Sequence, residues 1–290
     1  MAAIGEVPHT LPMRLEELKN RILARFPQSV RDRLWLARQW MLRMLSGGAF
    51  KRRKPDRHSA LKMARFGRFE IVFRGETADE EVIKLSFEND IFFPAVPEYH
   101  PQPGDTIVDV GAHIGTFSLL AAQRIAPGIV HAIEPSLDSF HFLRLNVALN
   151  DYPNIRANHF AIAANDGVAT LSHDNGNWGH STIANLSKSE ESVPAISLKS
   201  FFDSAGIDNC QLMKFNCEGA EFPALLAASK ETLRKVERYL VFYHCDLWKE
   251  NTESDLVAHF QQTGFNCSIL NKKAMRGWLV AMRDSHITPA

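Results

Sequence analysis

Val108-Asp109-Val110-Gly111-Ala112-His113-Ile114-Gly115-Thr116 decides how the rest of the chain is interpreted. The mostly β-branched residues 106–110 predict a short strand, and the apolar run that opens at Phe117 predicts a helix. Glycine at 111 and 115 allows a tight turn and a close approach of ligand to backbone. The free N–H groups at the start of the new helix favour a carboxylate or a phosphate. The stretch therefore predicts a cofactor seat on a strand-to-helix turn.

A second strand ends in a carboxylate about 20 residues after the turn. Residues 128–135 read Gly-Ile-Val-His-Ala-Ile-Glu-Pro, so Glu134 is placed to hold the two hydroxyls of a ribose. The dinucleotide fingerprint G-x-G-x-x-G is absent, because Ala112 occupies its middle position. The additional carboxylate, Asp109, suits a cationic amino acid group better than a pyrophosphate. The pattern favours S-adenosylmethionine over a nicotinamide dinucleotide, with a tight turn around another ligand as the alternative.

Charge is divided unevenly along a chain whose formal net charge is zero. Residues 1–68 hold sixteen Lys and Arg against five Asp and Glu, and the remainder holds seventeen against twenty-eight. Two helices are predicted in this basic appendage, 13–25 and 30–45. The second carries Arg around its whole circumference, which favours docking on the acidic body or on a partner subunit in a homo-oligomer over a surface-lying membrane helix. Its two Trp residues leave contact with an anionic membrane or a phosphorylated substrate open, whereas the acidic body disfavours nucleic acid.

Cysteine usage and hydropathy predict a cytoplasmic protein whose membrane contact, if any, is peripheral. The cysteines at 210, 217, 245 and 267 show no C-x-x-C pairing and follow no cleavable signal, which predicts free thiols in a reducing compartment. No run approaches eighteen uninterrupted apolar residues, so no transmembrane span is expected.

Strands and helices alternate from residue 104 onward, which predicts an α/β fold. The expected architecture is a Rossmann-like, seven-stranded, mostly parallel sheet with one antiparallel edge strand. The predicted strands are 106–110, 128–135, 155–162, 211–215, 239–243, 265–270 and 277–282. Residues 1–68 are expected to form a mainly helical appendage and 69–290 one domain. That domain divides into a leading segment (69–103), a cofactor core (104–245) and a C-terminal hairpin region (246–290).

Two further segments are candidates for the substrate mouth. Residues 88–97 are rich in aromatic residues and proline, directly before the cofactor strand. The polar loop 174–182 contains Trp178 and His180, and either connects strands or lines the site.

Five motifs, taken together in their order and spacing, resemble the FkbM-type family of S-adenosylmethionine-dependent methyltransferases over residues 80–245. They are Asp-Val-Gly-Ala-His-Ile-Gly at 109–115, Ala-Ile-Glu-Pro at 132–135, Leu-Asn-x-x-Leu-Asn at 145–150, Ala-x-x-x-Asn-Asp-Gly at 161–167, and Lys-Phe-Asn-Cys-Glu-Gly-Ala-Glu at 214–221. The resemblance implies a class I Rossmann-like methyltransferase acting on a hydroxyl of a sugar, a glycan or a small natural product.

The resemblance also implies which residues bind the cofactor. Asp109, Gly111 and Gly115 would hold its methionine part, Glu134 its ribose, and Asp166 would approach the adenine amine. The full set of predicted contacts is Asp109, Gly111, Ala112, His113, Gly115, Thr116, Glu134, Pro135, Ser136, Asp166 and Asn216. Asn216 breaks the family pattern Lys-x-Asp-x-Glu-Gly, but its amide can still orient a substrate or the cofactor amine.

An acceptor hydroxyl must lose its proton, so a general base is expected. The candidate catalytic residues are His244, His180, Glu218 and, as an orienting group, Asn216, with Glu221 a weaker candidate base. His244 is favoured because it ends a strand on the ligand side of the sheet, with a structural hydrogen-bonding role as the alternative. Glu218 can instead cap the following helix. No compact set of metal ligands is present, so no metal is expected.

Two other functional classes stay open. A nicotinamide-dependent oxidoreductase shares the turn and Glu134, but it should carry the three-glycine fingerprint. A non-catalytic binding or assembly protein on a degenerate methyltransferase fold agrees with Asn216, and it predicts weak or absent cofactor affinity.

Overall fold

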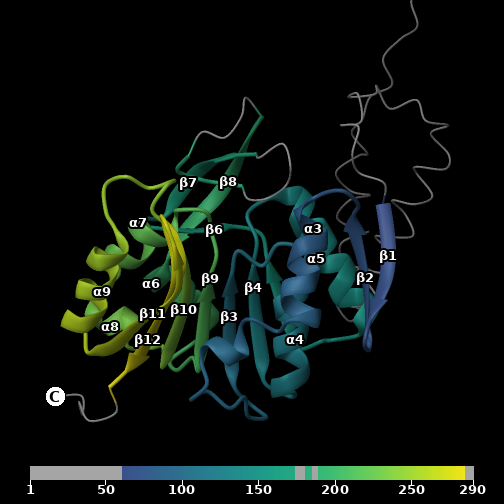
Figure 1. Ribbon diagram of the computed structural model, residues 1–290, viewed down its shortest axis with the longest axis horizontal. Helices are drawn as coiled ribbons and strands as arrows, with labels where there is room; N and C mark the ends of the chain where they lie inside the picture. Colours follow the sequence, from purple (N-terminus) through teal and green to yellow (C-terminus); the bar gives the residue numbers. More distant parts are fainter. Residues whose placement is uncertain (1–60, 174–179, 185–188, 285–290) are drawn as a thin grey trace, which may run out of the picture. The chain divides into compact units, whose positions relative to one another are not determined.

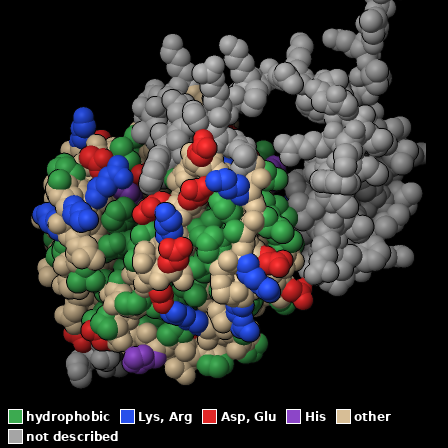
Figure 2. Space-filling view, turned by 45° about the vertical axis from the view of Figure 1, so that its right-hand side comes forward, with side chains coloured by type: hydrophobic (Ala, Val, Ile, Leu, Met, Phe, Trp, Pro, Cys, Tyr) green, Lys and Arg blue, Asp and Glu red, His purple; other side chains and the backbone are tan. Residues whose placement is uncertain are grey.

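The computed structural model describes residues 61–173, 180–184 and 189–284, all within the second of the two units, 1–52 and 53–290, into which the chain divides. The predicted appendage helices at 13–25 and 30–45, and Trp178, lie outside the described residues. No described helix is long and apolar enough to cross a bilayer. On the face seen in Figure 2, acidic and basic side chains are interspersed with apolar ones.

A seven-stranded sheet forms the centre of the described body, in the order β11-β12-β10-β9-β3-β4-β5 (Figure 1). Five adjacent strands, from β10 to β5 in this order, pair in parallel, and β12 is antiparallel to both of its neighbours. This confirms the predicted fold, with β12 lying one position inside the edge because β11 pairs on its outer side. The strands are β3 (Thr106–Val110), β4 (Ile129–Ile133), β5 (Ile155–Asn158), β9 (Leu212–Phe215), β10 (Arg238–His244), β11 (Phe265–Lys273) and β12 (Arg276–Arg283).

Helices cover both faces of this sheet (Figure 1). Successive side chains of a strand point to opposite faces, so a strand covered on both sides is apolar along its length. In β3, Ile107 belongs to the core on one face, and Val108 and Val110 belong to the core on the other. One face is covered by α4 (Thr116–Ile125) and α5 (Leu137–Asn150), the other by α6 (Leu198–Ala205), α7 (Glu221–Leu226), α8 (Lys230–Leu233) and α9 (Glu253–Gln262).

The segment before the sheet is fastened to α5. Residues 61–68, assigned to the appendage from sequence, form β1 (Leu61–Phe66) and a turn, and β1 pairs with β2 (Phe69–Arg74). Two asparagines of the 145–150 motif bond the backbone of β2: Asn146 accepts from the Val72 N–H at 2.8 Å, and Asn150 accepts from the Glu70 N–H at 2.8 Å. This motif therefore joins the leading segment to the cofactor core.

Short helices follow this hairpin. Thr77 caps α3 (Ala78–Ile83) by accepting a hydrogen bond from the Asp79 N–H, as its position before an acidic first turn predicts. A π-helix, η1 (Lys84–Glu88), and a 3₁₀ helix, η2 (Phe93–Ala95), lead on toward β3. The segment thus brings a series of apolar side chains to the edge of the cofactor core.

A small second sheet contains β6 (Ala161–Ala163), β8 (Glu190–Ser197) and β7 (Gly167–Ser172), in that order. The single strand predicted at 155–162 is divided here, because the chain leaves the large sheet after Asn158 and joins the small one at Ala161. Sequence analysis did not predict β8, whose charged start and internal Pro194 hide its alternating pattern.

Candidate active site

A cavity of about 280 Å³ opens at the carboxyl ends of the central strands. The turns after β3, β4 and β9 contribute to its wall, together with α3, η1, the segment before η2, and side chains from β10 and β12. The carboxyl ends of parallel strands are the expected position for a ligand in an open α/β sheet. The predicted cofactor turn and the turn after β9, which carries Asn216 and Glu218, therefore face one cavity.

The turn after β3 requires glycine at two places. Gly111 has φ +76°, and a β-carbon there would lie 1.9 Å from the carbonyl oxygen of Asn216. Gly115 has φ +88°, and its β-carbon would lie 2.6 Å from a methyl carbon of Leu143. Gly111 lines the cavity, together with Ala112, His113 and Thr116. Gly115 instead lets the turn pack against α5, outside the lining.

Glu134 presents its carboxylate to the cavity from the end of β4. Its two oxygens accept hydrogen bonds from the His113 N–H at 2.8 Å and the Ser136 N–H at 2.9 Å. Burial raises the pKa of Glu134 to about 7, against the opposing effect of these two amides. Pro135 also lines the cavity, whereas Ser136 is buried behind it and caps α5.

Asp109 lies beneath the turn, not on the cavity wall. It is fully buried, and its oxygens accept from Lys214 Nζ at 2.7 Å and from the Ser118 hydroxyl at 2.6 Å. Lys214 also donates to the carbonyl of Gly111 at 3.1 Å. This buried ion pair braces β3 against β9 and supports the turn, so a direct contact of Asp109 with a ligand is not available in this geometry.

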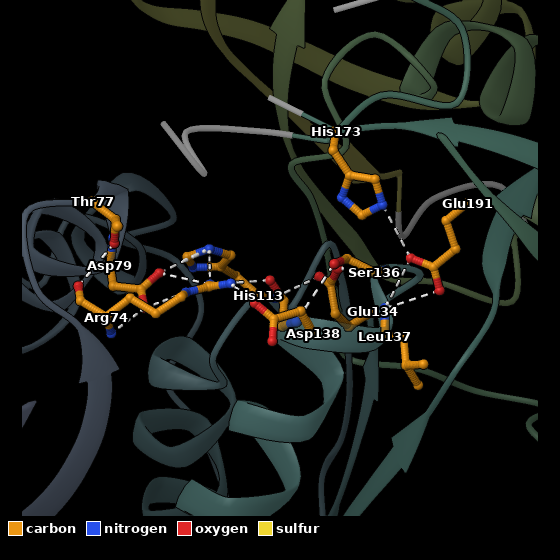
Figure 3. A network of polar contacts seen from close by, with 11 residues as sticks. Arg74, Thr77, Asp79, His113, Glu134, Ser136, Leu137, Asp138, His173 and Glu191 are labelled. Carbon is orange, nitrogen blue, oxygen red and sulfur yellow. Dashed lines mark hydrogen bonds and ion pairs between the residues drawn. The ribbon is translucent and has the colours of Figure 1, made fainter. Parts of the chain in front are cut away.

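A polar network connects the leading segment to the cofactor turn (Figure 3). Arg74, at the end of β2, forms a two-point ion pair with Asp79 at 2.8 and 2.9 Å and bonds Asp138 on α5 at 2.7 Å. His113 Nε2 lies 3.3 Å from both Arg74 and Asp79. Because His113 has φ +53°, this network holds an unfavourable backbone conformation in place.

Two buried polar atoms on the cavity wall have no hydrogen-bond partner among the described residues: Nδ1 of His113 and Oδ1 of Asn216. Unpaired buried polar atoms are costly, so both are suited to a ligand. Burial lowers the pKa of His113 to about 4, which keeps its imidazole neutral at physiological pH.

His180 and Thr182 also line the cavity. Burial, followed by the charge of the neighbouring His173, lowers the pKa of His180 to about 3. The Ser181 hydroxyl donates to the carbonyl of Glu218 at 2.9 Å, which holds this segment over the loop after β9. His180 is therefore a neutral wall residue with little capacity to hold a proton.

Glu218, His244 and Glu221 form a carboxylate-imidazole-carboxylate series that starts at the cavity wall and continues into the interior. Glu218 lines the cavity, and its Oε2 lies 3.4 Å from Nε2 of His244. Nδ1 of His244 lies 3.0 Å from Oε1 of Glu221, which also accepts the backbone N–H of His244. His244 is fully buried and does not line the cavity. Three of the predicted bases, Glu218, His244 and Glu221, thus come together, and of these three only Glu218 lines the cavity.

The pKa values of His244 and Glu218 both depend on their neighbours in this series. Burial lowers the pKa of His244, but the hydrogen bond and charge of Glu221 and the charge of Glu218 outweigh it, so the pKa is raised overall. Burial raises the pKa of Glu218, opposed by the charges of His244 and Arg276. The arrangement favours an imidazolium between two carboxylates and a cavity-facing carboxylate poised closer to neutral pH.

Asp166 lies away from the cavity. It is exposed, and its oxygens accept from the Ser197 N–H at 2.7 Å and the Ser200 hydroxyl at 2.6 Å at the start of α6. In place of the predicted contact with an adenine amine, Asp166 hydrogen-bonds the first residues of α6 and does not line the cavity. The apolar side chain of Ile162, on β6, lines the cavity instead.

Sequence analysis missed several contributors to the site. Arg74 and Asp79 give no motif of their own, and Phe242 and Trp278 lie on strands that were predicted without any ligand contact. Ile91 and Phe92 line the cavity from the aromatic segment 88–97, where part of the substrate mouth was expected. Within the described ranges, no three His, Cys, Asp or Glu side chains gather in a way that could hold a metal ion.

Comparison with known proteins gives the family of the chain. Residues 109–267 match the family described as Methyltransferase FkbM domain. The chain belongs to this family. It is therefore a methyltransferase, and its cofactor is S-adenosylmethionine. A search of curated proteins gave no match.

Solved structures with a similar arrangement include two proteins of M. jannaschii. TYW2, in complex with AdoMet, is 14% identical, with a TM-score of 0.42, over 77% of this chain and 85% of that one. The fibrillarin pre-rRNA processing protein is 11% identical, with a TM-score of 0.44, over 81% and 86%. A SAM-dependent methyltransferase from Aquifex aeolicus is 12% identical, with a TM-score of 0.39, over 65% and 87%.

The residues on the cavity wall fit S-adenosylmethionine. Glu134 offers a carboxylate for the ribose, and Ile162 offers an apolar surface beside it. The unpartnered Oδ1 of Asn216 can accept a hydrogen bond from an ammonium group. The helix α4 begins without a side-chain cap and borders the cavity through Thr116 and Phe117, which leaves its first amides to receive a carboxylate.

Proposed function

We propose that this methyltransferase transfers the methyl group to a hydroxyl oxygen, with Glu218 as the base. The supporting observation is the carboxylate of Glu218 on the cavity wall, backed by the buried His244 and Glu221. A hydroxyl group needs a base before or during methyl transfer, and a carboxylate with a raised pKa matches that role near neutral pH.

The cofactor would be held by residues of the β3, β4 and β9 turns. Glu134 would accept hydrogen bonds from the ribose hydroxyls, and Asn216 Oδ1 would accept one from the methionine ammonium. Gly111 would allow the backbone to approach the ligand closely. Asp109 would act only through Lys214 and the shape of the turn. When bound, S-adenosylmethionine supplies a methyl group on a positively charged sulfur and leaves as a neutral thioether.

The reaction asks two things of the chain. It must align the acceptor oxygen with the methyl carbon. Holding the two reactants in this geometry lowers the free-energy barrier by up to roughly 7–11 kcal/mol in favourable cases. It must also remove the hydroxyl proton. Glu218 would take that proton, and His244, held as an imidazolium by Glu221, would orient Glu218 and stabilise its charge in the ground state. His244 is then a positioning residue.

Transfer of a tritiated methyl group from S-adenosylmethionine to hydroxylated compounds tests this proposal, with mass spectrometry to identify an ether product. We expect Glu218→Gln to lower the transfer rate by about 10²–10⁴-fold, while the affinity for S-adenosylhomocysteine stays within twofold. Glu231→Gln, on the distant helix α8, is the matched control. Methylation of a nitrogen or carbon atom, or an unchanged rate in Glu218→Gln, would contradict the proposal. Cofactor binding without any transfer would favour a binding protein.

A further inference from the structure

One wall of the cavity is built mainly by residues outside the family match at 109–267. Its side chains come from α3, η1, the segment before η2, and the β10-β12 pair. All are apolar, and five of the six lie outside the matched range: Val82, Leu85, Ile91, Phe92 and Trp278, with Phe242 the exception. We refer to these six residues as the apolar wall. The turns that face the cofactor, by contrast, lie within the matched range.

The three aromatic rings of the apolar wall, Phe92, Phe242 and Trp278, pack in series. The rings of Phe92 and Trp278 have centroids 5.9 Å apart, and those of Phe242 and Trp278 are 4.7 Å apart. Phe242 also packs edge-on against the ring of His244 at 4.8 Å, so the wall extends to the residues that back Glu218. A group bound against this wall would therefore bring a neighbouring hydroxyl close to the proposed base.

The charges on the cavity disfavour an anionic acceptor. Glu134, Lys214 and Glu218 are the charged side chains that line it among the described residues. Lys214 is committed to Asp109 and to the carbonyl of Gly111, and the two lining histidines are held neutral by burial. A phosphate or carboxylate would find no unpaired cation on the described wall, and it would meet the negative charge of Glu218.

Resting on the proposed function, we propose that the acceptor is an uncharged alcohol or phenol whose hydroxyl is attached to an apolar ring or alkyl group, and that the apolar wall selects it. An apolar carrier gains free energy by leaving water at this wall. A sugar would lose hydrogen bonds to water there, with few polar partners to replace them. The hydroxyl would reach Glu218, which lines the same cavity as the apolar wall.

The test uses the full chain saturated with S-adenosylhomocysteine and four probes: cyclohexanol, 1-naphthol, glucose and glucose 6-phosphate. Saturation-transfer NMR reports which probes bind. We expect signals from cyclohexanol and 1-naphthol, and none from glucose 6-phosphate at the same concentration. Two variants of the half-buried part of the apolar wall, Leu85→Asp and Ile91→Asn, should weaken binding of 1-naphthol at least tenfold. Val168→Asp, at an exposed position on β7, is the control and should bind it normally.

Preferential binding of glucose or glucose 6-phosphate would overturn the proposal. Equal binding of 1-naphthol to the wild type and to both wall variants would overturn it as well. Titration with S-adenosylhomocysteine separates this result from failure of the proposed function, since the wall variants should keep their affinity for that ligand within twofold. A wild-type chain that does not bind S-adenosylhomocysteine would refute the proposed function itself.

Discussion

The two ends of the cavity differ in chemistry and in origin. At the end that faces the cofactor, Gly111, Glu134 and Asn216 lie on turns inside the family match, and backbone amides hold the carboxylate in place. At the acceptor end, the apolar wall comes mostly from outside that match and presents aliphatic and aromatic side chains. Under the proposed function, the donor site lies within the family match, while flanking segments shape the acceptor site.

The largest effect is expected where the cofactor end rests on a buried ion pair. Lys214→Met would leave the Asp109 carboxylate buried without its partner, which should reduce the free energy of unfolding by about 3–5 kcal/mol. Lys199→Met, which removes an exposed ion pair with Asp203, is the matched control and should leave stability unchanged. Urea denaturation measures both. Equal stability of the two variants would contradict the bracing role of Lys214.

A smaller effect is expected at the turn itself. Gly111 and Gly206 both have a positive φ, but only at Gly111 would a β-carbon meet the backbone of Asn216. Gly111→Ala should therefore cost about 1–3 kcal/mol more than Gly206→Ala, because the added methyl overpacks the contact between the β3 and β9 turns. Thermal or chemical unfolding of the two variants gives the difference directly. A smaller loss of stability in Gly111→Ala than in Gly206→Ala would contradict this, because it would mean that the β3 and β9 turns can move apart at little cost.

The acidity of Glu134 should make the cofactor end sensitive to pH. Its pKa of about 7 lies above the ordinary value of 4.5, so the free protein carries a proton there below about pH 7. Ribose hydroxyls donate to the ionised form, so affinity should fall as pH falls through 7, by up to about tenfold per unit. In the free protein, the stabilisation from this protonation is present below pH 4.5 and lost as pH rises through 7.

Titration calorimetry with S-adenosylhomocysteine at pH 8, 7 and 6 measures this dependence. Glu134→Gln cannot ionise at this position, so its affinity should be lower at pH 8 and nearly flat over the range. An equally steep pH dependence in that variant would assign the titration to another group.

The smallest effect is expected on cofactor affinity when a residue at the acceptor end is changed. Phe242→Leu alters the apolar wall but none of the groups that face the ribose or the methionine ammonium. Its dissociation constant for S-adenosylhomocysteine should stay within about twofold, or about 0.4 kcal/mol. A tenfold loss would mean that the two ends are not separate.

Local patterns predicted the strands and turns that line one end of the cavity. The glycine spacing, the carboxylate after the second strand and the alternation of strands and helices are all read from nearby residues, and they yield β3, β4, Gly111 and Glu134. The ion pair of Lys214 was not predicted, because its partner, Asp109, lies 105 residues earlier in the chain. That pairing follows only from the adjacency of β3 and β9.

The acceptor end could not be predicted in the same way. Phe92 and Trp278 pack against each other although most of the domain's sequence separates them, so no local pattern could predict the contact. His244 was favoured as the base from its position at a strand end, but complete burial places Glu218 between it and the cavity. Asp166 does not line the cavity, because its turn directs the carboxylate oxygens toward the start of α6.

Glu134 is the group proposed to hold the nucleoside of the cofactor. Calorimetric titration of S-adenosylhomocysteine into the wild type, Glu134→Ala and Asp166→Ala tests it in one experiment. We predict binding to the wild type, about 100-fold weaker binding to Glu134→Ala because hydrogen bonds to a charged group are lost, and unchanged binding to Asp166→Ala. No binding to the wild type, or a loss in Asp166→Ala with Glu134→Ala unaffected, would contradict the account.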